Sequence, residues 1–402
     1  MNKIARRDVL KAAALAGMSV LVPGSRRLRA QTGAPVRIGC TLPLTGPFAD
    51  TGTWVQRGYE YWAEEVNARG GLLGRPVELR VLDDASSVER ATSLLERLIS
   101  VDRVDLILGG YPGTSAAAQM LVAERYRKVY ISMGGHMASF SRGFKYSFGA
   151  PPLMGEWWYT GVWKWLATMN PAERPQRAAA ITLNNAIGQA VRKNMVDGLK
   201  SLGIPLVVDE LYTLPLASAE PLVQKAKGAG ADLFIANGFF GEGVQTVRAM
   251  KALDYNPKLF LQGIGSIIPE WVKELGPDGD YVVSGTPLHH KLPYPGLSRL
   301  VDVVKARFTL DEPPQYFLFG YAWAQALEKA VEGSKSLGDD DLASYLRLHP
   351  IDTIAGRLKF GETGLPEPYE YTTQVINGKV ELIWPLFART ADPVYPRPPW
   401  RR

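Results

Sequence analysis

The chain has 402 residues, of which 46% are hydrophobic and 21% charged. This length exceeds what one hydrophobic core commonly organises, so it predicts two lobes. Residues 1–30 contain seven basic residues and one acidic residue, and subtracting these from the totals of 46 and 40 leaves 39 of each sign. The net charge of +6 therefore belongs to the N-terminal segment. The remaining chain has no positive excess for binding nucleic acid or an anionic membrane.

The N-terminal segment has the pattern of an export signal. Arg6-Arg7 precede an apolar run over residues 12–22, and a polar stretch ends at Ala30. The pattern is typical of a twin-arginine signal peptide, and the alternative is a chance arginine pair before an N-terminal helix. At roughly 1.5 Å per residue this run is too short to span about 30 Å of hydrocarbon as a helix. We therefore expect export to the periplasm, removal of residues 1–30 and no direct membrane insertion afterwards.

The only cysteine, Cys40, excludes an internal disulfide and a thiolate metal cluster. It lies in the alternation Val36, Ile38, Cys40, Leu42, which predicts a buried strand position.

From Val36 onward, short apolar segments alternate with amphipathic segments of helical length, which favours parallel sheets covered by helices. The predicted strands are Val36–Leu42, Val77–Leu82, Leu106–Leu108, Val129–Ser132, Ala178–Leu183, Leu206–Leu211, Leu233–Ala236, Lys258–Leu261 and Tyr281–Ser284. The predicted helices are Trp54–Asn67, Ser87–Ile99, Ser115–Arg125, Ala190–Leu202, Ala219–Ala229, Gly243–Ala252, Tyr316–Glu332 and Asp339–Leu348. Gly70-Gly71 and Gly203 predict the ends of the helices Trp54–Asn67 and Ala190–Leu202, at matching places in the two halves of the chain.

The repeated plan predicts two doubly wound α/β lobes joined by a hinge of about three crossovers, with a ligand between them. We expect lobe I to comprise residues 36–150 and about 286–365, and lobe II residues 151–285 and about 366–390, with a tail over 391–402.

Catalytic groups are scarce in this sequence. The four histidines are His136, His289, His290 and His349, and no nucleophile elbow, zinc motif, phosphate loop or dinucleotide-binding fingerprint is present. Adjacent His289 and His290 would point to opposite sides of an extended segment and make a poor metal pair. Asp83-Asp84 close a strand before a helix and are interpreted as structural. The sequence therefore predicts neither an enzyme nor a cofactor or metal.

Several ordered segments carry a resemblance to a known family. They are Leu42-Pro43-Leu44-Thr45-Gly46-Pro47, Asn67-Ala68-Arg69-Gly70-Gly71, Asp83-Asp84, Gly109-Gly110, Ile131-Ser132, Asn184-Asn185-Ala186-Ile187-Gly188 and Ile354-Ala355-Gly356-Arg357-Leu358-Lys359-Phe360. In this order, from about Val36 to about Leu386, the chain resembles the leucine/isoleucine/valine-binding branch of the type I periplasmic binding proteins. The resemblance implies the capture component of an ABC importer, with a membrane permease as its partner.

In this family, hydroxyls and backbone amides of two loops in lobe I hold the ligand carboxylate. The resemblance places the first loop on Tyr111, Gly113, Thr114 and Ser115, at the start of a helix whose amides favour an anion. Thr114 or Ser115 could alternatively act only as a helix cap.

The second loop departs from the family pattern. It reads Ser132-Met133-Gly134-Gly135-His136, so Gly134 and Gly135 leave backbone amides accessible while His136 replaces a threonine. His136 could donate to the ligand. It could also be a loop histidine turned aside.

Lobe II differs from amino-acid binders as well. Ile264 stands at the place of the glutamate that pairs with a ligand ammonium, Ile187 stands where a tyrosine is common, and Phe239 keeps an aromatic ring. Because a buried ammonium needs an anionic partner, we expect an apolar or aromatic organic acid as the ligand. Trp157 and Trp158 could face the cleft or pack in the core.

Three other functions stay open at this point. They are a binder of branched-chain or other amino acids, a periplasmic ligand sensor of the same fold, and an exported α/β enzyme, which the missing catalytic motifs disfavour.

Overall fold

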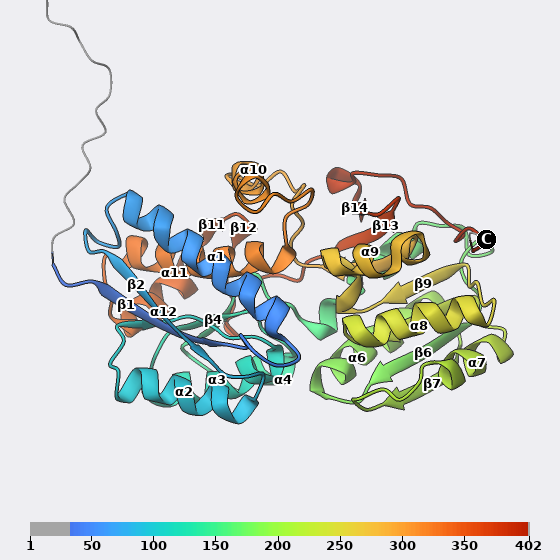
Figure 1. Ribbon diagram of the computed structural model, residues 1–402, viewed down its shortest axis with the longest axis horizontal. Coiled ribbons are helices and arrows are strands. Elements are labelled where there is room, and N and C mark those ends of the chain that lie inside the picture. The colour runs from blue at the N-terminus through green and yellow to red at the C-terminus, as the bar shows by residue number, and fades with distance from the viewer. Residues whose placement is uncertain (1–32, 401–402) are drawn as a thin grey trace, which may run out of the picture.

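The computed structural model describes residues 33–400, so the predicted export signal over residues 1–30 lies outside the described part. Two lobes of α/β structure lie side by side (Figure 1). None of the helices in residues 33–400 is long and apolar enough to cross a membrane.

Lobe I is built on a parallel sheet of order β2-β1-β3, beside a separate parallel pair, β4 and β5. Its strands are β1 (Val36–Leu42), β2 (Val77–Asp83), β3 (Leu106–Ile107), β4 (Tyr130–Ser132) and β5 (Ser147–Gly149). Its first helices are α1 (Ala49–Ala68), α2 (Val88–Ser100), α3 (Gly113–Tyr126) and α4 (Met137–Phe140). Later segments complete it: α10 (Leu297–Phe308), α11 (Gln315–Ser334), α12 (Asp339–Leu348), β11 (Ile351–Thr353) and β12 (Gly356–Leu358). Helix α11 packs along α1, far from it in sequence (Figure 1).

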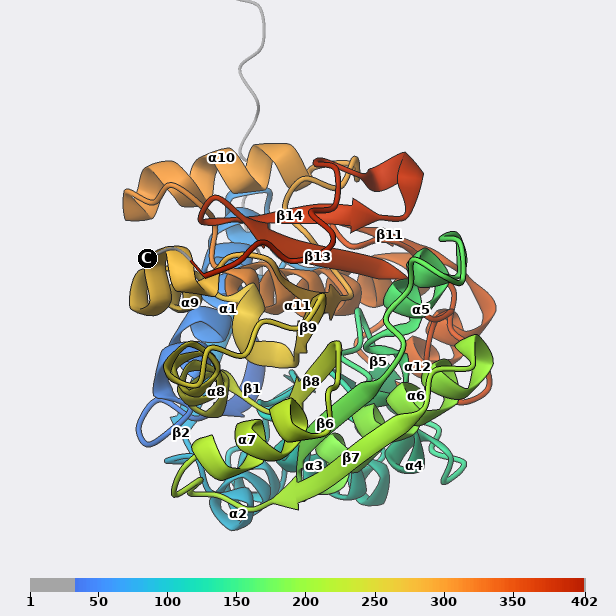
Figure 2. The ribbon, with the colours of Figure 1, turned by 90° about the vertical axis from the view of Figure 1, so that its right-hand side faces the viewer.

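Lobe II contains one larger sheet, of order β14-β13-β10-β9-β8-β6-β7, seen from its own side in Figure 2. Its strands are β6 (Ala178–Leu183), β7 (Leu206–Tyr212), β8 (Leu233–Asn237), β9 (Leu259–Gln262), β10 (Val282–Thr286), β13 (Tyr371–Ile376) and β14 (Lys379–Trp384). Its helices are α5 (Thr160–Ala167), α6 (Ala186–Leu202), α7 (Glu220–Gly228), α8 (Phe240–Ala252) and α9 (Pro269–Leu275). Short 3-10 turns are η1 (Gly155–Trp157), η2 (Ile264–Ile267), η3 (Gly276–Gly279) and η4 (Leu386–Ala388).

Three connections run between the lobes: from β5 to α5, from β10 to α10 and from β12 to β13. The mixed α/β fold with parallel sheets is the predicted one. The division proposed above, with changes of lobe near residues 150, 285 and 365, stays a proposal. Its first and third changes fall within two of these connections, and its second falls at the end of β10.

The predicted punctuation of two helices is confirmed. Helix α1 is followed by Gly70 and Gly71 with φ of 105° and 77°, and α6 is capped by Gly203 with φ of 71°. A β-carbon on Gly71 would lie 1.8 Å from the carbonyl oxygen of Arg75, so a side chain cannot be accommodated there without moving the backbone.

Strand β1 forms the centre of the lobe I sheet, between β2 and β3. The predicted alternation of Val36, Ile38, Cys40 and Leu42 is buried, and only Arg37 in this strand is exposed. The other positions are buried because helices cover both faces of a parallel sheet.

Several elements of the C-terminal half were not predicted. Strands β13 and β14 form an antiparallel hairpin that extends the lobe II sheet past β10, and β11 and β12 form a second hairpin. The expected tail is partly an ordered cover of lobe II: the Arg397 amide donates to the Lys258 carbonyl, and the Trp400 ring nitrogen donates to the Tyr255 carbonyl. These segments gain their structure from long-range pairing, which local periodicity does not encode.

The two carboxylates after β2 support the loop that follows β1. Asp83 accepts hydrogen bonds from the amides of Leu44, Thr45 and Ala85, consistent with a structural role. Asp84 is fully buried, and burial raises its pKa from 3.8 to about 6.

The pKa shift of Asp84 predicts a pH-dependent stability. Because the folded-state pKa lies above the unfolded value, the stability that this group contributes is complete below about pH 4 and is lost as the pH rises through about 6. We expect Asp84→Asn to raise the melting temperature at pH 7 and to lose this advantage at pH 4. Asp302→Asn, at an exposed position of α10, is the control. An equal gain at both pH values would contradict the argument.

Candidate functional site

The first lobe I loop enters α3 directly from β3. Pro112 is the N-cap residue and offers no side-chain cap, and Gly113 is the first helical residue. Ser115 is 1% exposed, and its hydroxyl has no hydrogen-bond partner among the described residues. The start of α3 therefore combines unsatisfied amides with a buried hydroxyl that lacks an internal acceptor or donor. Thr114 is half-buried beside them.

The second lobe I loop runs from β4 to α4. The Gly134 amide donates to the Ser132 hydroxyl over 3.2 Å, and Gly134 and Gly135 have φ of 84° and 150°. His136 is the N-cap residue of α4, and its ring nitrogens lie 3.2 and 3.4 Å from the Ser139 hydroxyl. Burial lowers the pKa of His136 and favours the neutral ring. His136 therefore faces its own helix in this structure.

Ile187 brings lobe II against both loops. A β-carbon on Gly113 would lie 2.7 Å from Cδ1 of Ile187 and 3.1 Å from Cα of Gly135. A β-carbon on Gly135 would lie 3.2 Å from the same Ile187 methyl group. The lobes thus touch here through two glycines and one aliphatic side chain, and this contact leaves no space for larger residues at the two glycine positions.

A chain of aromatic rings also crosses between the lobes. The Phe48 ring centroid lies 5.8 Å from that of Phe239 and 5.9 Å from that of Tyr111, both edge to face. Tyr111 in turn contacts Tyr316 of α11, with centroids 5.1 Å apart. Such pairs attract beyond the area they bury. The sequence prediction included Tyr111 and Phe239 but missed Phe48 and Tyr316, which only the fold brings alongside them.

A cavity of about 340 Å³ opens beside these rings, and we call it the cleft cavity. Segments 47–54 and 314–316 and Tyr111 line it from lobe I, and Leu214 and segments 239–242 and 264–270 line it from lobe II. Its charged lining residues are Asp50, Glu242 and Glu270, and no lysine, arginine or histidine of the described chain is among them. The Glu242 carboxylate accepts a hydrogen bond of 3.0 Å from the Phe239 amide and so caps the N-terminus of α8.

Ile264 lines the cleft cavity at the start of η2. It also lines a smaller space of about 20 Å³, together with Ile187, Phe239 and Trp158. The buried Trp158 ring nitrogen donates to the Ser284 hydroxyl over 3.2 Å, whereas Trp157 packs edge to face on Tyr369. Of the two tryptophans considered from the sequence, Trp158 borders this smaller space, whose lining residues all belong to lobe II, and Trp157 packs away from it.

The structure therefore gathers most of the residues proposed from the sequence at the interface of the lobes. Tyr111, Phe239 and Ile264 line the cleft cavity, and Ile187 lies against Gly113 and Gly135 across the interface. Gly134 packs toward Met154 and Pro152 of the connection that follows β5, and Thr114, Ser115 and His136 line neither space. Their assignment as ligand contacts stays a prediction.

Two α/β lobes linked by three connections and separated by a lined cavity define a two-lobed ligand-binding fold of the type I kind. Residues 35–379 match the family described as periplasmic binding protein. The chain belongs to this family, whose members are periplasmic solute-binding proteins and not enzymes.

Curated relatives include the Leu/Ile/Val-binding protein homolog 7 of Brucella abortus (strain 2308), 26% identical over 342 residues that cover 83% of this chain and 85% of the relative. A branched-chain amino acid transporter substrate binding protein of Streptococcus pneumoniae, solved with isoleucine, has a TM-score of 0.75 at 19% identity and covers 86% and 98% of the two chains. An ABC transporter solute binding protein of Rhodopseudomonas palustris BisB5, solved with 3,4-dihydroxybenzoic acid, has a TM-score of 0.76 at 18% identity and covers 86% and 95%. These two structures share the fold of this chain.

Proposed function

We propose that the protein captures a small organic monocarboxylate by closing its lobes around it. The observation that carries this proposal is the buried, unpartnered Ser115 hydroxyl at the start of α3. A carboxylate there would accept hydrogen bonds from the hydroxyl and from the first amides of the helix, in a water-poor site. Closure is then a population shift driven by contacts that the ligand makes with both lobes.

The rest of the ligand is expected to be apolar or aromatic. Phe48, Tyr111, Phe239 and Tyr316 offer ring faces and edges, and Ile264 offers an aliphatic wall. Since the charged lining of the cleft cavity is acidic, a second negative group on the ligand would be repelled. The similar structure solved with 3,4-dihydroxybenzoic acid supports this substrate class.

A branched-chain or other amino acid is the second candidate. Ile264 removes the expected carboxylate, but Glu270 and Asp50 line the cleft cavity and could receive an ammonium group at a different position. The similar structure solved with isoleucine supports this alternative.

The proposed cellular setting is the periplasm, reached by the twin-arginine route after loss of residues 1–30, with delivery of the ligand to the permease of an ABC importer. A sensory role of the same closed form is the alternative. Impaired uptake of the ligand in a strain without this protein would support the transport role.

A thermal-shift screen of residues 31–402 against amino acids and against aromatic, aliphatic and hydroxylated carboxylic acids tests the ligand class. A ligand at 100 times its dissociation constant should stabilise the protein by about 2.7 kcal/mol. We expect monocarboxylic organic acids to raise the melting temperature and dicarboxylic analogues to fail. Selective stabilisation by leucine or isoleucine would instead favour the amino-acid alternative.

A further inference from the structure

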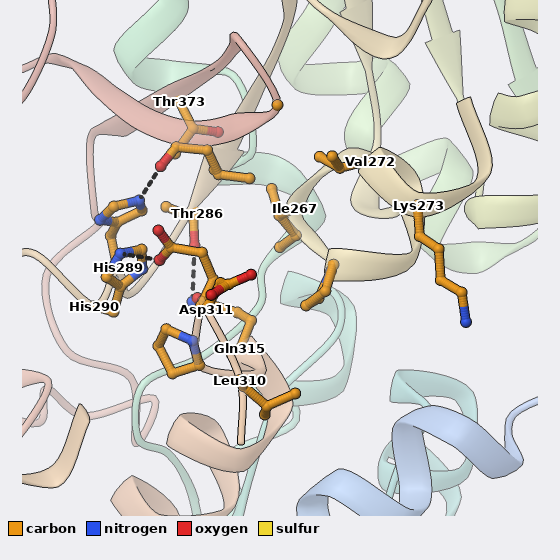
Figure 3. A pocket seen from close by; sticks show the side chains of 15 residues that line it. Ile267, Val272, Lys273, Thr286, His289, His290, Leu310, Asp311, Gln315 and Thr373 are labelled. Atoms are coloured by element: carbon orange, nitrogen blue, oxygen red, sulfur yellow. Dashed lines mark hydrogen bonds and ion pairs between the residues drawn. The ribbon is translucent and has the colours of Figure 1, made fainter. Parts of the chain in front are cut away.

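A second cavity, of about 330 Å³, lies at the hinge and is here called the hinge cavity (Figure 3). Lobe II lines it with η2, α9 and the β13–β14 hairpin. Lobe I lines it with residues 310–313 before α11 and with Gln315 at the start of α11, and the connection after β10 contributes His289 and His290. Its size falls within the range of small-molecule pockets, and Ile267, Val272, Leu310 and Val380 make it largely apolar.

The two histidines attach the connection to both walls of this cavity. The Lys291 amide donates to Nδ1 of His289, so Nε2 carries the proton and donates to the Val380 carbonyl over 2.9 Å. Burial lowers the pKa of His289 to about 3 and keeps this ring neutral. His290 stacks on it, with centroids 4.3 Å apart, and its Nε2 lies 2.7 Å from the Glu312 carboxylate. The backbone is thus tied to lobe II through His289 and to lobe I through His290.

The polar groups left uncommitted on the lobe I wall are hydrogen-bond acceptors. The Asp311 carboxylate has no hydrogen bond or ion pair with any described residue, and Oε2 alone of Glu312 is engaged, by His290. Gln315 is 6% exposed and uses its amide nitrogen on Thr286 and the Leu288 carbonyl, whereas no described residue donates to its Oε1.

The uncommitted donor of the cavity lining, Lys273, lies apart from this wall. Figure 3 shows its amine pointing away from the histidines and Asp311. The wall therefore lacks a donor that complements its acceptors.

We propose that the hinge cavity binds a primary amine with a small apolar body, whose ammonium meets Asp311 and Oε1 of Gln315 and whose body packs on Ile267 and Val272. Three N–H donors match the acceptors of the wall, and the apolar part is removed from water by lobe II. Both lobes line the cavity, so the amine contacts each of them in the closed arrangement.

The hinge cavity shares part of its wall with the cleft cavity. Gln315 and Pro269 line both spaces. An amine that contacts both lobes favours the closed form and therefore raises the affinity for the ligand in the cleft. By linkage, the ligand in the cleft raises the affinity for the amine by the same factor. The coupling rests on the proposed function, whereas the binding of the amine does not.

Isothermal titration of the mature protein with 2-phenylethylamine and with uncharged 2-phenylethanol tests the site. We expect the amine to bind at least tenfold more tightly than the alcohol. Asp311→Asn should weaken amine binding at least fivefold, whereas Asp302→Asn on α10 should leave it unchanged. Both aspartates are exposed, so neither variant threatens the core. Equal affinity of the amine for wild type and Asp311→Asn, or no binding at millimolar concentration, would overturn the proposal.

The acidic lining of the cleft cavity is the competing place for an amine. If Glu270→Gln weakens 2-phenylethylamine binding and Asp311→Asn does not, the amine occupies the cleft and the hinge site is rejected. Filling the hinge cavity by Val272→Phe should abolish amine binding while the carboxylate found in the ligand screen still stabilises the protein. If no carboxylate binds wild type or any variant while the amine still binds, the proposed function is rejected and the proposed amine site is not.

Discussion

Ser115→Ala is expected to weaken binding of the carboxylate ligand by about 10- to 150-fold, which corresponds to the loss of one hydrogen bond to a charged group, about 1.5–3 kcal/mol. The same change should leave the melting temperature of the ligand-free protein unchanged or slightly higher. The reason is that the Ser115 hydroxyl is buried without a partner among the described residues, so its removal deletes an unsatisfied polar group.

Titration calorimetry with the ligand from the screen and thermal unfolding without ligand measure the two effects. Ser93→Ala, on the exposed side of α2, is the matched control and should change neither. A large drop in the stability of ligand-free Ser115→Ala would mean that the hydroxyl serves the fold. If Ser115→Ala binds the carboxylate ligand with unchanged affinity, the carboxylate does not bind at the start of α3.

Gly113→Val should weaken binding by about 5- to 150-fold, because overpacking of a close contact costs about 1–3 kcal/mol. A β-carbon added at this position would lie 2.7 Å from Cδ1 of Ile187, so a branched side chain is expected to hold the lobes apart. Small-angle scattering should show that the ligand no longer reduces the radius of gyration of the variant.

A second substitution separates steric blocking from loss of fold. Gly113→Val combined with Ile187→Ala should recover part of the affinity and of the compaction, because the smaller side chain makes room across the interface. Gly228→Val, where an added β-carbon meets nothing within 4 Å, is the control. Wild-type binding by Gly113→Val would show that lobe contact at Ile187 is dispensable for capture.

The local parts of the fold were predictable from the sequence because short-range physics determines them. The strand Val36–Leu42 was predicted with its observed bounds, since an apolar run between turn residues suits a covered parallel strand. The ends of α1 and α6 followed from glycines that adopt positive φ at little cost. The sequence also placed the loop at Tyr111–Ser115 at a helix start, where α3 begins.

Long-range pairing and side-chain direction were decided only by the tertiary structure. The β13–β14 hairpin joins β10 across about 90 residues of chain, and no local pattern states that partner. His136 could face a ligand or turn aside, and packing orients it toward Ser139. Phe48 and Tyr316 come from distant segments and meet Tyr111 only after folding. The hinge cavity arises in the same way, from four segments whose contacts depend on the arrangement of the two lobes. Cavities are properties of packing and not of any single stretch of sequence.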